Sequence, residues 1–309
     1  MIERIYAITI NTFREAVRDR VLYGVLGFGT AVLLFTLALA ELSLEERERV
    51  VIDIGLASIS IFSVLVAIFL GSSLLYKEIE RKTLYVILPR PIRRWEFLVG
   101  KYLGIVLTGT VFITTMGAIQ LWVTAIMAGA SWLWLLLVPV GLAAVAALGA
   151  WRVRDRTALL APWSLLALAG CAAVCGTTEV DLWLVLTSLL LFVGEVAVLA
   201  AAALLFSSFS TPFLTGVFTG GVWLVGRSAG DMASMRSQAL PEELRNLLHL
   251  LAEVVPNFNL FFPGRNTLTT MAEQGGLWLY VGETMGYAFC YAAILLVVGA
   301  VIFRRRDFL

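Results

Sequence analysis

The stretch LYKEIERKTLYVILPRPIRRWEFLVGKYLG, residues 75–104, decides how the chain is arranged. It separates two long apolar runs and is too charged to lie within lipid. Its basic side chains are Lys77, Arg81, Lys82, Arg90, Arg93, Arg94 and Lys101. Because loops rich in lysine and arginine stay on the cytoplasmic side of a membrane, we expect this loop to be cytoplasmic.

The interior of this loop has a pattern of its own. Helical spacing joins four apolar residues: Ile79, Leu84, Ile87 and Leu88. Pro89 and Pro91 then end the helix, because proline lacks an N–H and restrains the residue before it. A second helix can begin near Ile92. The pattern favours a short, rigid cytoplasmic lever over residues 77–96, since a loop that only fixes topology needs neither an apolar stripe nor paired prolines.

The composition of the 309-residue chain indicates a membrane protein. Hydrophobic residues make up 60% of it and charged residues 15%, whereas a soluble domain has about 45–50% and about 25%. We therefore predict one all-α domain over residues 1–309, a polytopic bundle of membrane helices. Cys171, Cys175 and Cys290 all fall in apolar runs, so no disulfide framework is expected.

Residues 1–20 predict an amphipathic elbow helix on the membrane surface rather than a cleavable signal peptide. The apolar positions at helical spacing are Ile2, Ile5, Tyr6, Thr9, Phe13 and Val17. Arg14, Arg18 and Arg20 also place this segment in the cytoplasm. The alternative is that these residues are the frayed start of the first span.

About eight apolar runs are candidates for membrane spans of roughly 20 residues. They are 21–40, 54–76, 97–127, 132–150, 157–176, 182–206, 213–225 and 277–303. We expect Lys101 to extend to the cytoplasmic surface at the start of its span. Basic loops alternate with acidic ones, which places both termini in the cytoplasm. If residues 132–176 form a re-entrant hairpin, the count falls to six with the same orientation.

The loop at 226–276 is predicted to lie outside. Within it PEELRNLLHLLAEVV, residues 241–255, is typical of an amphipathic helix. Pro241 suits its first turn and Pro256 its end. We expect this helix to lie against the outer leaflet or to cover the exit of a pathway.

Catalytic signatures are missing from the sequence. It contains no GxxxxGK[ST] phosphate loop and no HExxH, GxSxG or CxxC motif, so we expect neither nucleotide hydrolysis nor another catalytic activity in this chain. The soft ligands Met232, Met235, Met271 and His249 could suit Cu(I), but their spacing is loose and we predict no metal site. The single histidine, His249, is more typical of a polar helix face.

Three ionisable residues fall within or beside apolar runs. Glu195 lies near the middle of its span and should face the interior, bonded to a Ser or Thr of a neighbouring helix or lining a polar path. Glu283 is a second pathway candidate, although it can also extend to the outer interface. For Arg227 we expect the interface.

The chain resembles the permease subunits of the second class of ATP-binding-cassette (ABC) exporters, which includes drug, polysaccharide and copper-enzyme-maturation permeases. The resemblance covers most of the chain. It rests on the elbow residues Phe13, Arg14, Glu15 and Arg18, the loop quoted above, LLFSSFSTP at 204–212 and IFRRRDF at 302–308. The usual pattern has a core of six spans, so residues 132–176 look like an inserted hairpin.

The resemblance implies that the loop holds a coupling helix that docks on a separate ATPase subunit. The implied docking residues are Glu78, Glu80, Arg81, Thr83, Leu84, Leu88, Pro91 and Arg94. ATP and Mg would be held by that ATPase, with no cofactor in this chain. The implied assembly is two ATPase chains and two permease chains, a homodimer or a pair of paralogues, in the lipid of a bacterial or archaeal cytoplasmic membrane. No nucleic acid is implied, and the substrate is not identified.

Other classes remain open at this point. An ion-coupled secondary transporter or channel would use Glu195 as its proton site, although one deep acid is a short relay. The chain could also be a scaffold for other membrane proteins. A membrane-embedded enzyme is the least favoured, because no cluster of catalytic side chains is visible.

Overall fold

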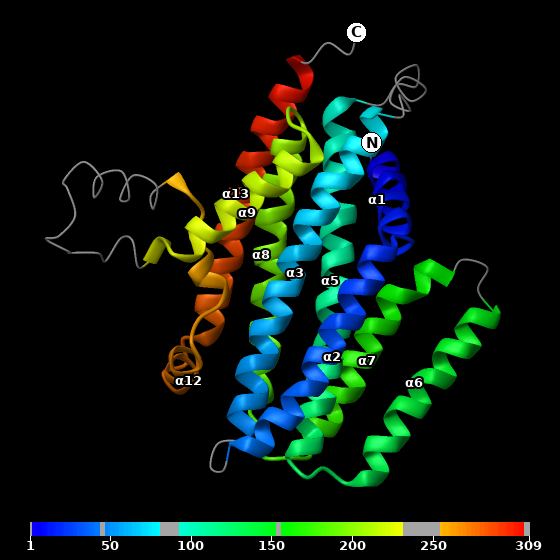
Figure 1. Cartoon of the computed structure of the whole chain (residues 1–309), viewed down its shortest axis with the longest axis vertical. Helices are drawn as coiled ribbons and strands as arrows, with labels where there is room; N and C mark the ends of the chain where they lie inside the picture. Colours follow the sequence, from blue (N-terminus) through cyan, green and yellow to red (C-terminus); the bar gives the residue numbers. More distant parts are fainter. Residues whose placement is uncertain (1, 44–46, 81–92, 153–155, 231–253, 306–309) are drawn as a thin grey trace, which may run out of the picture. The chain divides into compact units, whose positions relative to one another are not determined.

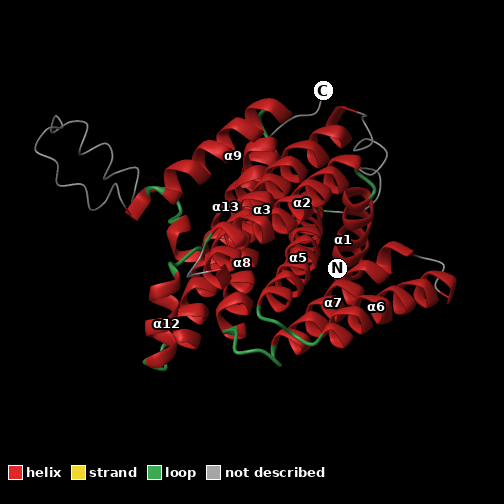
Figure 2. Cartoon of the chain, turned by 60° about the horizontal axis from the view of Figure 1, so that its bottom comes forward, coloured by secondary structure: helices red, strands yellow, loops and turns green. Residues whose placement is uncertain are grey.

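The computed structural model describes residues 2–43, 47–80, 93–152, 156–230 and 254–305 (Figure 1). The described elements are helices joined by short connections, without a strand among them (Figure 2). The prediction of an all-α polytopic bundle is confirmed. The α-helices are α1 (Ile2–Val17), α2 (Arg20–Leu42), α3 (Arg47–Glu80), α5 (Arg94–Met127), α6 (Trp132–Arg152), α7 (Leu160–Cys175), α8 (Leu182–Ser207), α9 (Pro212–Arg227), α12 (Arg265–Glu273) and α13 (Leu277–Arg305). Two 3₁₀ turns, η1 (Arg156–Leu159) and η2 (Phe258–Phe261), complete the described elements.

In the described part of the chain, seven helical stretches are long and apolar enough to cross a membrane. They include both arms of the 132–176 hairpin, Trp132–Arg152 and Thr157–Cys175. The remaining predicted span, 213–225, falls on α9, which has only 16 residues. At about 1.5 Å per residue α9 rises roughly 24 Å, less than the roughly 30 Å of the hydrocarbon core. Helix α9 is therefore shorter than the thickness of the hydrocarbon core.

Two compact units divide the chain. Unit 1 comprises residues 1–12, 67–106 and 194–309. In it, Gly71 of α3 lies so close to Ala203 of α8 that a Cβ at Gly71 would overlap the alanine side chain. A Cβ at Gly299 of α13 would lie 3.6 Å from both Leu205 Cα in α8 and Leu98 Cδ2 in α5. The ends of α8 and α13 and the start of α5, all predicted to be cytoplasmic, thus meet in one place.

Helix α1 confirms the predicted helical elbow and packs, in unit 1, against the start of α5. Its Ile8 meets Gly100, and Thr12 meets Gly104. The Thr9 hydroxyl donates to the Gly100 carbonyl oxygen at 3.2 Å. The two glycines are a turn apart, and their lack of side chains lets the two backbones approach closely.

Unit 2 comprises residues 13–66 and 107–193. Its core includes Ala40 of α2, Val51 of α3 and Val123 of α5. The Gln120 side chain of α5 occupies the space left by Gly55 and donates to the Val51 carbonyl oxygen at 3.0 Å. A buried amide that donates to backbone in this way fixes the register of two helices.

The hairpin formed by α6 and α7 also belongs to unit 2. Its two arms pack against each other, and the Trp163 indole of α7 donates to the Leu142 carbonyl oxygen of α6 at 3.2 Å. None of the residues of α6 is buried. In contrast, α7 buries a stripe that ends in the two free thiols Cys171 and Cys175.

Candidate functional site

The predicted ATPase-docking residues fall mainly outside the described part of the chain. Those outside it are Arg81, Thr83, Leu84, Leu88 and Pro91. Glu78 and Glu80 belong to the last turn of α3, whose backbone alone is described there. Arg94 is the first residue of α5 and is half-buried. The docking role of these residues stays a prediction.

The start of α5, directly after the predicted coupling loop, carries two buried charged side chains, Glu96 and Lys101. The Glu96 carboxylate accepts a hydrogen bond from the Arg93 backbone N–H at 3.2 Å, the return half of a capping box. Arg4 of α1 approaches the same carboxylate at 4.0 Å. Lys101 is also buried, with its ammonium 5.8 Å from the centre of the Phe97 ring. The expectation that Lys101 extends to the membrane surface is wrong, because its side chain is enclosed by the protein.

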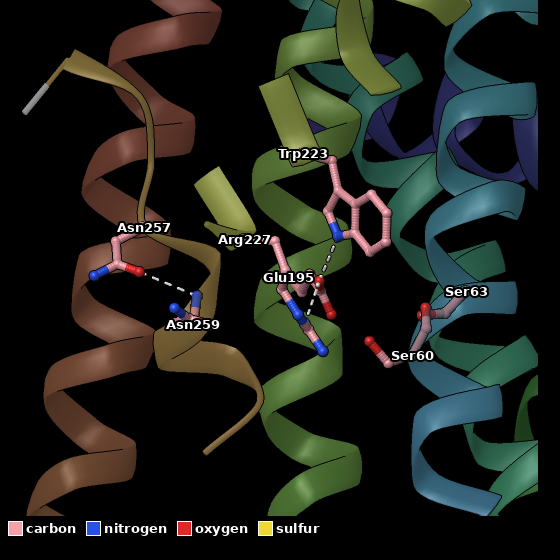
Figure 3. Close-up of polar contacts among 7 residues, drawn as sticks. All are labelled: Ser60, Ser63, Glu195, Trp223, Arg227, Asn257 and Asn259. Carbon is pink, nitrogen blue, oxygen red and sulfur yellow. Dashed lines mark hydrogen bonds and ion pairs between the residues drawn. The ribbon is translucent and has the colours of Figure 1, made fainter. Parts of the chain in front are cut away.

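A second candidate centres on Glu195 of α8 (Figure 3). This side chain is 0% exposed, as expected for a residue that faces the interior. Its Oε1 atom accepts a hydrogen bond from Trp223 Nε1 at 2.8 Å and one from Arg227 Nη1 at 3.3 Å. Both donors lie one turn apart on α9. Glu195 is about 18–20 Å from either end of α8, so the cluster lies near the middle of that span.

Arg227 does not extend to the outer interface, and that expectation is wrong. Its guanidinium turns inward to Glu195 and lies over aromatic rings. The guanidinium carbon lies 4.4 Å from the centre of the Phe262 ring and 6.0 Å from that of Trp223. Such cation–π contacts stabilise a cation that has left water. Glu283, the other pathway candidate, lies on the exposed side of α13.

Helix α9 presents its polar side to the protein. Thr215 and Thr219 are fully buried, and Trp223 and Arg227 continue the same spacing of four residues. The Thr215 hydroxyl lies 2.8 Å from the Ser210 hydroxyl. Large apolar side chains such as Phe213 are exposed on the other side. This inverted amphipathicity is typical of a membrane helix that faces lipid outward and polar groups inward.

A connecting segment, residues 254–262, runs along α13, contains η2 and carries Phe262, whose ring lies against Arg227. Three tyrosines of α13 bond to its backbone. Tyr280 donates to the Leu260 carbonyl oxygen at 2.6 Å, Tyr291 donates to the Val254 carbonyl oxygen at 2.6 Å, and Tyr287 accepts from the Asn257 N–H at 3.0 Å. Backbone groups that lack partners within a helix need other hydrogen bonds wherever water is excluded. The three tyrosines therefore satisfy part of the backbone of this segment.

Two glycines let this segment approach the helices around it. Gly226 of α9 is crowded by the Pro256 carbonyl oxygen and the Phe258 ring, and Gly194 of α8 by the Phe261 ring. The Asn257 side chain accepts a hydrogen bond from the Asn259 N–H at 3.0 Å and tightens the turn into η2 (Figure 3). The Glu195 cluster is thus closed on one side by packed backbone and aromatic rings.

The remaining candidates are placed as follows. In α1, Phe13 is buried, Arg14 is half-buried and Arg18 is exposed. Met232, Met235 and His249 lie outside the described residues, as does the predicted helix at 241–255, whereas Met271 belongs to α12. Within the described ranges, no three His, Cys, Asp or Glu side chains come together as metal ligands.

The family described as ABC-2 family transporter protein matches residues 6–308. The chain belongs to this family. No curated protein matches it. Because the match spans nearly the whole chain, the permease is a multi-pass membrane protein of the ABC transporter type.

The contacts around Glu195 and along α13 go beyond what the sequence predicts. The prediction for Glu195 includes neither Trp223 nor Arg227 as a partner. It also leaves out Phe262, which lies against Arg227, and the three tyrosines of α13 that bond to the backbone of residues 254–262. A signal was present for each set: Thr215, Thr219, Trp223 and Arg227 recur every four residues in an apolar helix, and Tyr280, Tyr287 and Tyr291 follow a helical face. Both patterns predict one polar side on a membrane helix.

Proposed function

We propose that this ABC-2 permease is the membrane-spanning subunit of an ATP-driven exporter, coupled to a separate ATPase through residues 77–96. The observation that carries the proposal is the match to the ABC-2 family over residues 6–308. A chain that lacks a phosphate loop needs a partner to hydrolyse ATP. ATP and Mg would reside on that partner, and this chain would supply the path for an outward-moving substrate.

The start of α5 directly follows that loop and is packed firmly enough to move together with it. Glu96 caps the helix and approaches Arg4 of α1, while Gly100 and Gly104 hold α1 against α5. Close backbone packing of this kind transmits displacement, because packed helices shift as units rather than deform. ATP binding drives the cycle only if the ATPase states bind two permease conformations with different affinity.

The arrangement of unit 1 supports the proposed orientation. The meeting of α8, α13 and α5 places together three ends that the positive-inside rule assigns to the cytoplasm. Both termini would then be cytoplasmic, in the cytoplasmic membrane of a bacterium or archaeon. A homodimer or a pair of paralogous permeases with two ATPase chains would complete the assembly.

The test is co-purification of an ATPase with the detergent-solubilised chain. The variant carries Glu80→Arg with Arg94→Glu, which reverses charge on both sides of the coupling loop. The control carries Glu41→Arg with Arg47→Glu, which exchanges the partners of an exposed ion pair of 3.3 Å at the opposite end of α3. We expect the wild type and the control to retain the ATPase and the coupling variant to lose it.

The contrary outcomes are distinct. If the ATPase stays bound to the coupling variant, the ATPase must dock on another surface of the permease. If no ATPase co-purifies with the wild type under mild conditions, the exporter proposal fails. The ion-coupled transporter would then be tested through Glu195→Gln in a proton-coupled transport assay.

A further inference from the structure

The guanidinium of Arg227 uses little of its hydrogen-bonding capacity. A guanidinium carries five N–H donors in one plane. In the part of the chain that the structure describes, the hydrogen bond of Arg227 is the one from Nη1 to Glu195 Oε1 at 3.3 Å. The other Arg227 contacts are with the faces of aromatic rings. Most of its donors are therefore available to a further acceptor.

The two members of the ion pair differ in access. The Arg227 side chain is 25% exposed, whereas Glu195 is fully enclosed. A molecule approaching this cluster meets the cation first. It does so at the middle of the span, where an arginine costs several kcal/mol unless it is paired. A second anionic group there would gain a strong interaction in a medium of low dielectric constant.

The surroundings of Arg227 orient it for an anion. The guanidinium carbon lies 4.4 Å from the centre of the Phe262 ring. A guanidinium can bind a carboxylate or phosphate through two parallel hydrogen bonds along its edge. Exposed apolar residues of α9, among them Val217 and Leu224, lie on the neighbouring outward side.

We propose that Arg227 is a binding residue for a carboxylate or phosphate group. Glu195 is the counter-ion of Arg227 when no ligand is bound, and the anionic group of the ligand competes with Glu195 for the guanidinium. The bound molecule is an anionic amphiphile, because the site combines one cation with aromatic rings and an apolar helix surface. Its identification as cargo rests on the proposed exporter function, whereas the anion site does not. A purely structural pair would only fasten α9 to α8.

Glu195→Gln separates these two roles by the sign of its effect. The amide keeps the shape of the side chain and can still accept from Trp223, but without a negative charge it competes far less for the guanidinium. Anion binding should therefore become tighter, by about tenfold, the value of a charge-assisted hydrogen bond. Arg227→Gln should abolish the preference for anions, and Arg227→Lys should weaken it, because lysine lacks the planar fork.

The experiment measures binding to the purified full-length chain, with its ATPase bound if one co-purifies. The probes are dihexanoylphosphatidylglycerol and, as the zwitterionic match, dihexanoylphosphatidylcholine. Inorganic phosphate is added as a competitor, so displacement indicates that a free anion suffices, and no displacement indicates that a lipid-like molecule is needed. Arg152→Gln, at an exposed position at the end of α6, is the matched control for loss of one positive charge.

We expect the wild type and Arg152→Gln to prefer the anionic lipid by about tenfold, and Glu195→Gln to prefer it more strongly. Equal affinity for both lipids in the wild type would overturn the proposal. Weaker anion binding in Glu195→Gln that parallels Arg227→Lys, with both proteins folded by gel filtration, would also overturn it and indicate a structural pair. Retention of the ATPase is scored separately, so failure of the anion site leaves the exporter proposal standing.

Discussion

Helices α8 and α6 are both single, strongly apolar spans, yet they occupy opposite environments. In the most apolar stretch of α8, 72% of the residues are buried, against 0% in that of α6. Helix α8 carries the small residues 200–203, all buried, and the deep acid Glu195. Small side chains and polar groups are what membrane helices use to associate. Apolar character identifies a span, but these two features decide whether it packs inside.

Helix α6 instead has the features of a helix in contact with lipid. Trp132 and Trp134 are exposed near its start and Trp151 near its end. The first and last are separated by roughly 28 Å of helix, close to the roughly 30 Å of the hydrocarbon core. Tryptophans at both ends are typical of the two membrane interfaces. This spacing favours a full crossing over a re-entrant hairpin.

The largest expected effect on stability comes from the ion pair between Glu195 of α8 and Arg227 of α9. Glu195→Ala should lower the free energy of unfolding by about 3–5 kcal/mol, because it leaves the partly buried guanidinium of Arg227 without its carboxylate. The measurement is an SDS titration in mixed micelles. Glu283→Ala, at an exposed position of α13, should change it by less than about 0.5 kcal/mol. If the two variants lost equal amounts of unfolding free energy, burial of the acid would not determine how much it stabilises the protein.

A leucine-to-alanine pair compares the two helices directly. Leu199 of α8 is fully buried, whereas Leu136 of α6 is 58% exposed. Leu199→Ala should cost about 2–4 kcal/mol through the cavity that it leaves, and Leu136→Ala close to nothing, since lipid fills the space. The same titration measures both. A large loss for Leu136→Ala would indicate that a partner, rather than lipid, covers α6.

Glycine substitutions provide the next contrast. Gly71→Leu would force α3 away from Ala203 of α8 and should cost about 1–3 kcal/mol. Gly141→Leu in α6 meets no atom within 4 Å of a built Cβ, so its stability should match that of the wild type or exceed it slightly. Thermal unfolding in detergent compares the two. Tolerance of Gly71→Leu would show that the two helices can separate without penalty.

The smallest effect concerns the tyrosines of α13. Tyr291→Phe removes the hydrogen bond to the Val254 carbonyl oxygen and should cost about 0.6–1 kcal/mol. It should also speed hydrogen exchange in the segment at 254–262, measured by mass spectrometry, with exchange in α6 as the internal reference. Unchanged exchange at 254–262 would mean that this bond does not hold the segment.

Much of the fold could be predicted from the sequence because lipid imposes simple constraints. Each predicted apolar run became a helix, and the elbow formed as expected. The start of α3 was misplaced, since it begins at Arg47 rather than at 54. The charged residues at 47–53 favour a loop in the sequence. In the structure they belong to α3, where Arg49 and Asp53 form an i,i+4 ion pair of 3.6 Å.

The site could be predicted only in part. Glu195 was recognised because an acid in the middle of an apolar run has few explanations. Arg227 and Lys101 were misplaced for one reason: both lie near the end of a run, where long basic side chains usually reach the interface. What turns Arg227 inward is its partner on α8 and the ring of Phe262. Those contacts join positions far apart in the sequence, and no local pattern contains them.

The shortness and polarity of α9 have a consequence for how the protein enters the membrane. A 16-residue helix that carries two buried threonines and an arginine is a weak insertion signal, since arginine opposes transfer into lipid by about 2.5 kcal/mol or more. Helix α8 is synthesised first and carries the matching acid. The two segments should therefore leave the translocon as a pair, with α8 retained at its lateral exit until α9 arrives.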